Sequence, residues 1–315
     1  MAVSIHSLWL YPVKSLAGFE VDKSVLTPKG LLGDRIWMIV KPCGTMLTQR
    51  KAPQMACIEA RFTQPDAPLT SPILLTDTRD NSYIIVPQPS NHGTLNTIVH
   101  SDSCPANIAS DIANAWITQK INTNMRLRLV AFDQQQTRIM TDSKRFGSDA
   151  THFADAAPFL VVNKHSIDAV NKEMDVFAPA ISQTSDTQTH HHVGIQHFRP
   201  NIVIEGLRAF DEHHYVSLAP EHNPINNRLL PSNTTTNNAN WHISLIDHCQ
   251  RCSMITNNPQ TGIMQKSPLF HIIAKLNPMP NNPKAPAFGV NATVTLPDKT
   301  INTTVSKNMP LQLDA

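Results

Sequence analysis

The sequence predicts a mixed α/β protein rich in β-structure, and three observations support this fold class. Apolar residues make up 41% of the 315 residues, enough to bury a substantial core. The 10 glycines and 24 prolines are about 11% of the chain, well below the roughly 25–30% of low-complexity sequences. Short apolar runs bounded by Pro and Gly recur along the chain, whereas we find clear helical periodicity in two segments.

The first third of the chain has the pattern of short strands. Residues 7–13, 36–40 and 83–86 are the clearest of these, and 41–44 (Lys-Pro-Cys-Gly) are expected to form a hairpin turn between 36–40 and 45–48. Several short strands at this spacing are typical of a small barrel or sandwich. An N-terminal β-barrel-like domain over 1–122 is therefore expected.

A helix over about 108–121 is expected to close this first domain. Its apolar residues recur at helical spacing: Ile108, Ile112, Trp116, Ile117 and Ile121. The second domain, 123–315, is expected to open with a strand at 126–130.

The second domain combines apolar strands with a helix. Residues 158–162 form a buried strand by composition, and Ser166 is expected to cap a helix that buries Ile167, Val170 and Met174. Alternating apolar residues near 294–296 and 305–313 indicate strands that return to a sheet.

Two polar stretches interrupt this pattern and are expected to be surface insertions. One lies near 182–192 and ends in three histidines, 190–192, and the other covers 220–240. Neither stretch has enough apolar surface to order itself by burial. We assign no function to the histidines, which in such a loop are expected to be solvated.

Charge and glycine content exclude several classes of protein. The 26 basic and 24 acidic residues give a net charge of +2, which disfavours binding to a nucleic-acid polymer. The closest pair of glycines is Gly30 and Gly33, so neither a P-loop nor a dinucleotide fingerprint is present. An anionic cofactor would have to be held mainly by side chains.

Cysteine content and hydropathy indicate the compartment. Five cysteines in a chain of this length do not suggest a disulfide scaffold, so a reducing, cytoplasmic location is expected. No apolar run reaches the roughly 18–20 residues that span a bilayer, so no membrane anchor is expected.

The segment Cys249-Gln250-Arg251-Cys252 is the most informative motif, and three interpretations are open. Structural zinc would need further ligands and no second Cys pair exists, whereas a thioredoxin-like dithiol would need a following helix and 253–256 has an extended pattern. The third interpretation is two half-buried cysteines in a sheet. Arg251 beside Cys252 favours a thiolate, which is a strong ligand for a transition metal.

Three further segments place cations or hydroxyls at the ends or entrances of strands. Lys14 and Ser15 are expected in an exposed turn after the first strand, Arg35 next to Asp34 before the second, and Arg199 and Asn201 before a later one. Arginine and lysine are the side chains that bind phosphate when glycine loops are absent.

Four ordered motifs resemble those of MOSC-domain molybdenum proteins: residues 11–15, 33–37, 198–203 and 249–262. The likeness covers nearly the whole chain and is greatest to the mitochondrial amidoxime-reducing component and its bacterial relatives. It implies an N-terminal MOSC β-barrel domain followed by a MOSC β-barrel domain with peripheral helices.

The resemblance also implies a cofactor and a set of site residues. The cofactor is molybdenum-molybdopterin without a nucleotide, with Cys252 as the metal ligand. Asp155 falls beside the substrate side of the metal, where we expect it to relay protons or orient substrate. The residues that fall on cofactor-binding positions are Lys14, Ser15, Arg35, Arg199, Asn201 and Arg251.

The function that this resemblance implies is oxygen removal from small N-hydroxylated compounds by a molybdopterin-dependent oxidoreductase. Because Cys252 is the last cysteine of the sequence, we expect no ferredoxin domain after it, and we expect electrons from a separate ferredoxin, cytochrome b5-like protein or flavoprotein reductase. The alternative is a cofactor carrier or a sulfur-handling protein with a persulfide on Cys252, and a third hypothesis is that the cysteines bind zinc or merely pack. The resemblance also implies pyridoxal phosphate binding.

Overall fold

Seven strands close into one barrel in the computed structural model, which describes residues 2–90, 93–140, 150–181, 192–221, 241–296 and 303–315. The order is β14-β15-β1-β21-β16-β17-β19, and β19 pairs back with β14. Only the β14–β15 pair is parallel in this ring. The strands are β1 (Val3–Leu10), β14 (Phe159–Asn163), β15 (Ile202–Glu205), β16 (Ser217–Pro220), β17 (His242–Gln250), β19 (Asn282–Thr295) and β21 (Pro310–Asp314).

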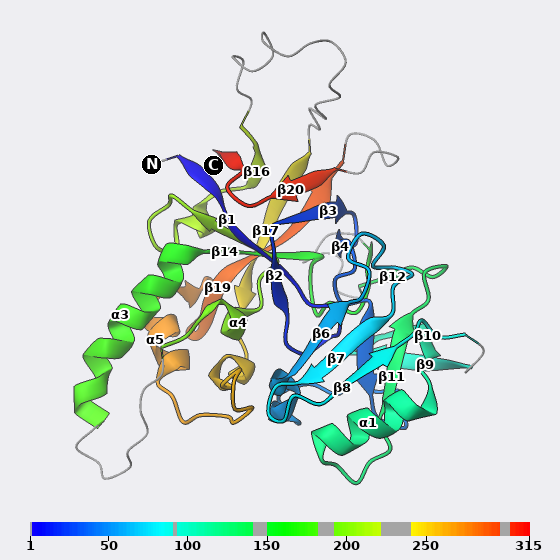
Figure 1. Ribbon diagram of the computed structural model, residues 1–315. Helices are drawn as coiled ribbons and strands as arrows, with labels where there is room; N and C mark the ends of the chain where they lie inside the picture. The colour runs from blue at the N-terminus through cyan, green and yellow to red at the C-terminus, as the bar shows by residue number, and fades with distance from the viewer. Residues whose placement is uncertain (1, 91–92, 141–149, 182–191, 222–240, 297–302) are drawn as a thin grey trace, which may run out of the picture.

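The first strand of the chain belongs to this barrel (Figure 1). β1 lies between β15 and β21, with Ser4 opposite Glu205 on one side and Val3 opposite Leu311 on the other. The barrel is filled by buried aliphatic side chains from strands far apart in sequence, such as Ile5, Ile204 and Ala292. Burial of this shared core fixes the N-terminal strand to the C-terminal half of the chain.

A half-barrel of two further sheets covers one end of the barrel. One sheet has the order β5-β11-β10-β9 and the other β6-β7-β8. Their strands are β5 (Trp37–Val40), β6 (Ile58–Phe62), β7 (Ile73–Asp77), β8 (Tyr83–Val86), β9 (Thr94–Val99), β10 (Asp102–Ile108) and β11 (Arg128–Phe132). β11 pairs with β5 and β10, so strand pairing crosses residue 122, where the sequence predicts a domain boundary. The boundary itself stays a prediction.

Short strands complete the sheets. They are β2 (Phe19–Val21), β3 (Lys23–Thr27), β4 (Gly30–Leu31), β12 (Arg138–Ile139), β13 (Ala150–Thr151), β18 (Pro278–Met279) and β20 (Thr304–Ser306). The β-rich fold class, with barrel domains and few helices, is confirmed.

Most of the expected strands form, with small differences. The prediction at 83–86 coincides with β8, whereas the predicted strand at 7–13 begins earlier and ends at Leu10, because the Tyr11 backbone N–H turns to the Asp34 carboxylate (2.9 Å). The turn at 41–44 forms, but its second arm meets the first at one bridge, Val40 with Met46, because the chain there also pairs with Ile98.

The expected helix in the first domain is α1 (Asp111–Ile121), and it starts later than predicted. Ser110 caps it, with its Oγ accepting from the Ala113 N–H at 3.3 Å. Ile108 belongs to β10, and Ile112 is 75% exposed, so the buried face consists of Ala113, Ile117 and Ile121.

The second predicted helix is α3 (Lys164–Ile181), and its expected cap was wrong. Ser166 lies inside the helix and is buried, with its Oγ bonded to both carboxyl oxygens of Glu212. Asn163 Oδ1 instead accepts from the His165 N–H at 3.1 Å. The predicted face is confirmed, since Ile167, Val170 and Met174 are buried against α5 (Leu269–Leu276) on one side of the barrel (Figure 1).

The short helices are α4 (Ile195–Phe198), η1 (Pro53–Cys57), η2 (Asp211–His214) and η4 (Ser253–Thr256). No helix in the described ranges is both long and apolar enough to cross a bilayer. Of the predicted insertions, 182–191 and 222–240 lie outside the described residues. His192 is described and contacts Asp175 at 2.6 Å.

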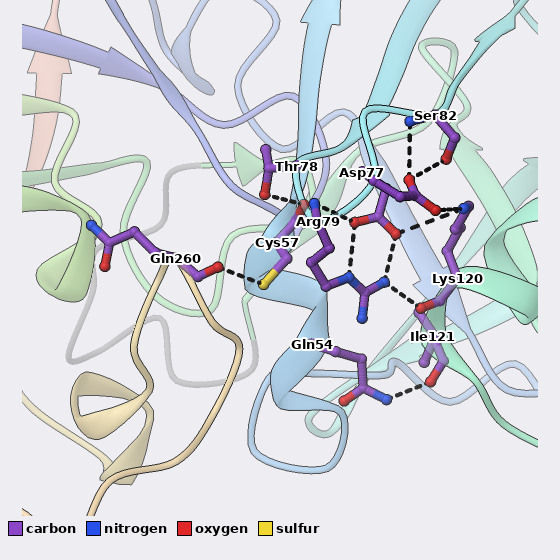
Figure 2. Close-up of polar contacts among 10 residues, drawn as sticks. Gln54, Cys57, Asp77, Thr78, Arg79, Ser82, Lys120, Ile121 and Gln260 are labelled. Atoms are coloured by element: carbon purple, nitrogen blue, oxygen red, sulfur yellow. Dashed lines mark hydrogen bonds and ion pairs between the residues drawn. The ribbon is translucent and has the colours of Figure 1, made fainter. Parts of the chain in front are cut away.

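A polar clasp holds the C-terminal end of α1 (Figure 2). Two nitrogens of Arg79 donate to the buried Asp77 carboxylate (2.8 and 2.6 Å), and Arg79 also donates to the Lys120 carbonyl at 2.6 Å. Gln54 donates to the Ile121 carbonyl. These bonds satisfy carbonyls that a helix end leaves without partners. On the other side of η1, Cys57 Sγ contacts the Gln260 carbonyl at 3.4 Å, which ties the half-barrel to the loop after Cys252.

Candidate functional site

A cavity of about 410 Å³ lies where the half-barrel meets the barrel, and every predicted site residue lines it. The half-barrel side is formed by the turn after β1, by the approach to β5 and by the β9–β10 turn. The barrel side is formed by the segment before β14, by the approach to β15 and by the end of β17. The predicted residues in its wall are Lys14, Ser15, Arg35, Asp155, Arg199, Asn201, Arg251 and Cys252.

Three of these residues have left-handed backbones although none is glycine. The φ angles are 66° at Ser15, 48° at Arg35 and 56° at Arg199. Such conformations cost on the order of 1–3 kcal/mol each and tend to occur at functional sites. Here they reverse the chain at the cavity wall, and Arg199 is also the residue that ends α4.

Tyr11 forms a platform beneath two of the arginines. Its ring centroid lies 4.5 Å from Arg35 Cζ and 4.3 Å from Arg199 Cζ, within the range of cation–π contacts. The ring is fully buried, and burial raises the pKa of the phenol, so it stays neutral. Both guanidinium groups therefore contact the same neutral ring.

Backbone carbonyls and one amide fix these guanidinium groups. Arg35 donates to Asn201 Oδ1 (2.9 Å) and the Arg199 carbonyl (3.1 Å), and it pairs with Asp34. Arg199 donates to the Leu16 carbonyl at 2.6 Å. Burial lowers the pKa of Arg199 to about 10, so Arg199 remains charged at neutral pH.

The turn that carries Lys14 and Ser15 is buried rather than exposed, which corrects the expectation from sequence. Their exposed fractions are 3% and 6%, because the Lys14 N–H bonds to the Trp37 carbonyl and Gln49 donates to the Ser15 carbonyl. Lys14 Nζ donates to the Phe153 carbonyl at 2.7 Å and to Asp155 Oδ1 at 2.5 Å. Burial lowers the pKa of Lys14, and its ion pair with Asp155 opposes that shift.

Asp155 has a second partner, His100, that the sequence did not indicate. His100 Nε2 lies 2.8 Å from Asp155 Oδ1, and its side chain is 45% exposed. The side chain of Asp155 is 56% exposed. Partial loss of water at the cavity wall would raise its pKa, but the charge of Lys14 and the hydrogen bond from His100 hold the pKa well below the ordinary value. His100 is 55 residues away in a turn, so the only local signal was its place after a strand.

The cysteine motif lies at the end of β17, with two differences from expectation. Residues 253–256 form the 3-10 helix η4 rather than an extended segment, because the Ile255 and Asn257 N–H groups turn back to the carbonyls of Cys252 and Met254. Arg251 donates to Cys249 Sγ (3.0 Å) and to the Phe198 carbonyl (2.7 Å). The cysteine to which it hydrogen-bonds is therefore Cys249 rather than Cys252. Cys252 is exposed and lines the cavity.

The charge of the cavity wall favours an anionic ligand. Arg50 joins Lys14, Arg35, Arg199 and Arg251, and Asp155 is the one carboxylate among the lining residues. Arg251 Nε is buried and has no hydrogen-bond partner among the described residues. Nowhere in the described ranges are three His, Cys, Asp or Glu side chains grouped so that they could hold a metal ion. A phosphorylated cofactor that brings its own metal ligands and needs one thiolate fits this donor set.

Two curated relatives are similar to this chain over 84% of its length. A protein named mitochondrial amidoxime reducing component 2, from Bos taurus, is 26% identical over 274 residues, which cover 84% of this chain and 70% of that protein. Mitochondrial amidoxime-reducing component 1 from Mus musculus is also 26% identical, covering 84% of this chain and 69% of its own length.

More distant similarities extend the comparison. Molybdenum cofactor sulfurase from Arabidopsis thaliana is 24% identical over 84% of this chain but only 30% of its own length. The solved structure of the YUAD protein from Bacillus subtilis aligns over 99% of this chain and 94% of its own length. The sequence identity is 7% and the TM-score is 0.35. The family model described as MOSC N-terminal beta barrel domain matches residues 2–124, and the model described as MOSC domain matches 148–303. The chain therefore carries a MOSC N-terminal beta barrel domain followed by a MOSC domain.

Proposed function

We propose that this protein is a molybdopterin-dependent reductase that removes oxygen from small N-hydroxylated compounds. The observation that supports it most is the single cavity in which an exposed cysteine, an ionised carboxylate and several buried cations meet. The curated relatives named amidoxime-reducing components favour the same chemistry. Electrons would come from a separate redox protein.

The residues of the cavity divide into two groups. Lys14, Arg35, Arg199 and Arg251 would hold the phosphate and the polar edge of the cofactor, with Ser15 and Asn201 in the same wall, and Cys252 would ligate the metal. When bound, the cofactor would supply the two-electron redox chemistry.

Asp155 lies on the remaining side of the cavity. Because Lys14 holds it ionised, it would accept a hydrogen bond from the N–H or O–H of a substrate and so orient it.

A cofactor carrier or sulfur-handling role is the second candidate. The exposed thiol of Cys252 and the similarity to molybdenum cofactor sulfurase favour it. In that case Cys252 would carry a persulfide, and the cations would hold the cofactor for transfer.

The decisive experiment uses the protein expressed in a host that makes the cofactor. We expect molybdenum and the fluorescent oxidised pterin in the purified protein, and reduction of an aromatic amidoxime with a chemical electron donor. Cys252→Ala should lose molybdenum and activity, whereas the control Cys43→Ala, at an exposed cysteine in the 41–44 turn, should keep both.

Two results would contradict the reductase proposal. Full activity in Cys252→Ala would remove the thiolate from the mechanism. A persulfide on Cys252 by mass spectrometry, together with bound cofactor but no reductase activity, would support the carrier role instead.

A further inference from the structure

His100 and Asp155 form a carboxylate–imidazole pair across the junction of the half-barrel and the barrel. His100 comes from the turn between β9 and β10, where its φ is 55°, and Asp155 comes from the segment before β14. The pair is joined through His100 Nε2 and Asp155 Oδ1 at 2.8 Å, and both side chains line the cavity. Within the described ranges the other imidazole nitrogen, Nδ1, has no hydrogen-bond partner.

Buried cations hold the carboxylate segment of this pair. Arg138, only 2% exposed, donates to the carbonyls of His152 and Ala154, both at 2.8 Å, and Lys14 holds the carbonyl between them, that of Phe153. Three successive carbonyls are thus fixed by charged donors, which bond more strongly than neutral ones.

The same arginine also reaches the histidine side of the pair. Arg138 Nη2 donates to Asp102 Oδ2 at 2.8 Å, and Asp102 begins β10 two residues after His100. The turn of His100 and the segment of Asp155 are therefore anchored to one buried guanidinium group. Such bracing is expected where the relative position of two side chains matters.

The chemistry of the proposed reaction needs a proton donor at this place. Reduction of a hydroxylamine, R–NHOH, to R–NH₂ and water breaks the N–O bond and consumes two electrons and two protons. One proton goes to nitrogen and the other to the departing oxygen, and the electrons come from the redox protein. Asp155 is poorly suited to deliver a proton, because Lys14 keeps it ionised.

Resting on the proposed function, we propose that His100 is the general acid that delivers a proton to the departing oxygen, with Asp155 as the residue that positions it. Imidazole is the side chain that changes charge near neutral pH. A carboxylate on one nitrogen orients the ring, so the other nitrogen can act as acid. The 45% exposure of His100 lets solvent return the proton after each turnover.

The charged groups around His100 define its electrostatic surroundings. Asp155 contacts it directly, Lys14 lies on the same carboxylate oxygen, and Arg50 lines the same cavity. Arg138 and Asp102 form an ion pair with each other at 2.8 Å.

The test compares His100→Asn with wild-type holoprotein, because asparagine tolerates the left-handed turn. We expect an unchanged molybdenum content, little change in KM and a fall in kcat of about a hundredfold, the usual contribution of a general acid. The variant should lose the pH dependence that His100 gives to the wild-type rate, and added imidazole should restore part of kcat. The control is His192→Gln, which breaks a similar Nε2–carboxylate contact with Asp175 outside the cavity and should change nothing.

A second readout does not depend on activity. In ¹⁵N-labelled protein without cofactor, the His100 ring should carry a hydrogen-bonded Nε2–H proton whose signal disappears in Asp155→Asn. If the wild type is active and His100→Asn is equally active, the role of His100 is overturned and the proposed function is not. A molybdenum-loaded wild type that reduces no N-hydroxylated compound would overturn the proposed function itself, and absence of the Nε2–H signal would overturn the pair.

Discussion

Replacement of Glu212 by glutamine should make the protein more stable at pH 8 than the wild type, by an amount that grows with pH. Glu212 is fully buried in η2, where Ser166 Oγ donates to its two carboxyl oxygens at 3.0 and 3.1 Å. Burial raises its pKa from 4.5 to about 7. His213, 3.9 Å away, does not neutralise it, because burial lowers the pKa of that imidazole to about 3.

The magnitude follows from the two pKa values of Glu212. The unfolded chain releases this proton near pH 4.5 and the folded chain only near 7, so ionisation favours unfolding in the window between them. The stabilisation is complete below pH 4.5 and is lost as pH rises through 7, by about 3 kcal/mol in total. Glutamine has no proton to release and lacks this loss.

Urea unfolding at pH 5, 6, 7 and 8 measures the effect as the difference between Glu212→Gln and wild type. Taking the difference removes the opposite contribution of His152 and His197, whose pKa values are lowered to about 4 by burial and whose stabilisation is lost as pH falls. The control Glu221→Gln, at an exposed position, should show no slope. A difference that stays constant over this pH range would refute the reasoning.

Substitutions at two further residues, Tyr11 and Arg79, test the platform and the clasp. Tyr11→Phe removes a buried hydroxyl that has no partner among the described residues and should cost no stability in thermal unfolding, whereas Tyr11→Leu should lose about 1 kcal/mol for each guanidinium contact and retain less cofactor. Arg79→Ala should lower the free energy of unfolding in urea by about 2 kcal/mol, because Asp77 and the end of α1 lose their donors. Arg79→Lys should recover little of it, since lysine lacks the two-nitrogen fork, and full recovery would contradict the clasp.

Features set by neighbouring residues were predictable from sequence. The strand at Tyr83–Val86 and the helical face of Ile167, Val170 and Met174 follow from local patterns of apolar residues. The assignment of Ser166 as a cap failed because its hydroxyl partner, Glu212, lies 46 residues away. A hydroxyl near a helix start has the same local pattern whether it caps the helix or serves a distant carboxylate.

In the candidate site too, local motifs predict the positions of residues but not their distant partners. The motifs place Arg35, Arg199 and Arg251 at the entrances and ends of strands, and in the structure all three line one cavity. The partners of these arginines could not be predicted, because several are main-chain carbonyls such as those of Leu16 and Phe198. Every residue has a carbonyl, so no residue type in the sequence marks those that accept from a buried cation.

The buried cations also explain why the sequence has a nearly neutral charge and yet a strongly charged site. A buried charge is costly unless it is paired. Here carbonyls, Asp34 and the ring of Tyr11 contact most of the donors without cancelling the charge of Arg199 or Arg251, and Arg251 Nε has no partner among the described residues. Carbonyl dipoles stabilise a cation in place, but they leave its field in the cavity. An anionic ligand would complete this balance, so its binding and the folding of the cavity wall are coupled. The arginines therefore belong to the fold and to the site at once.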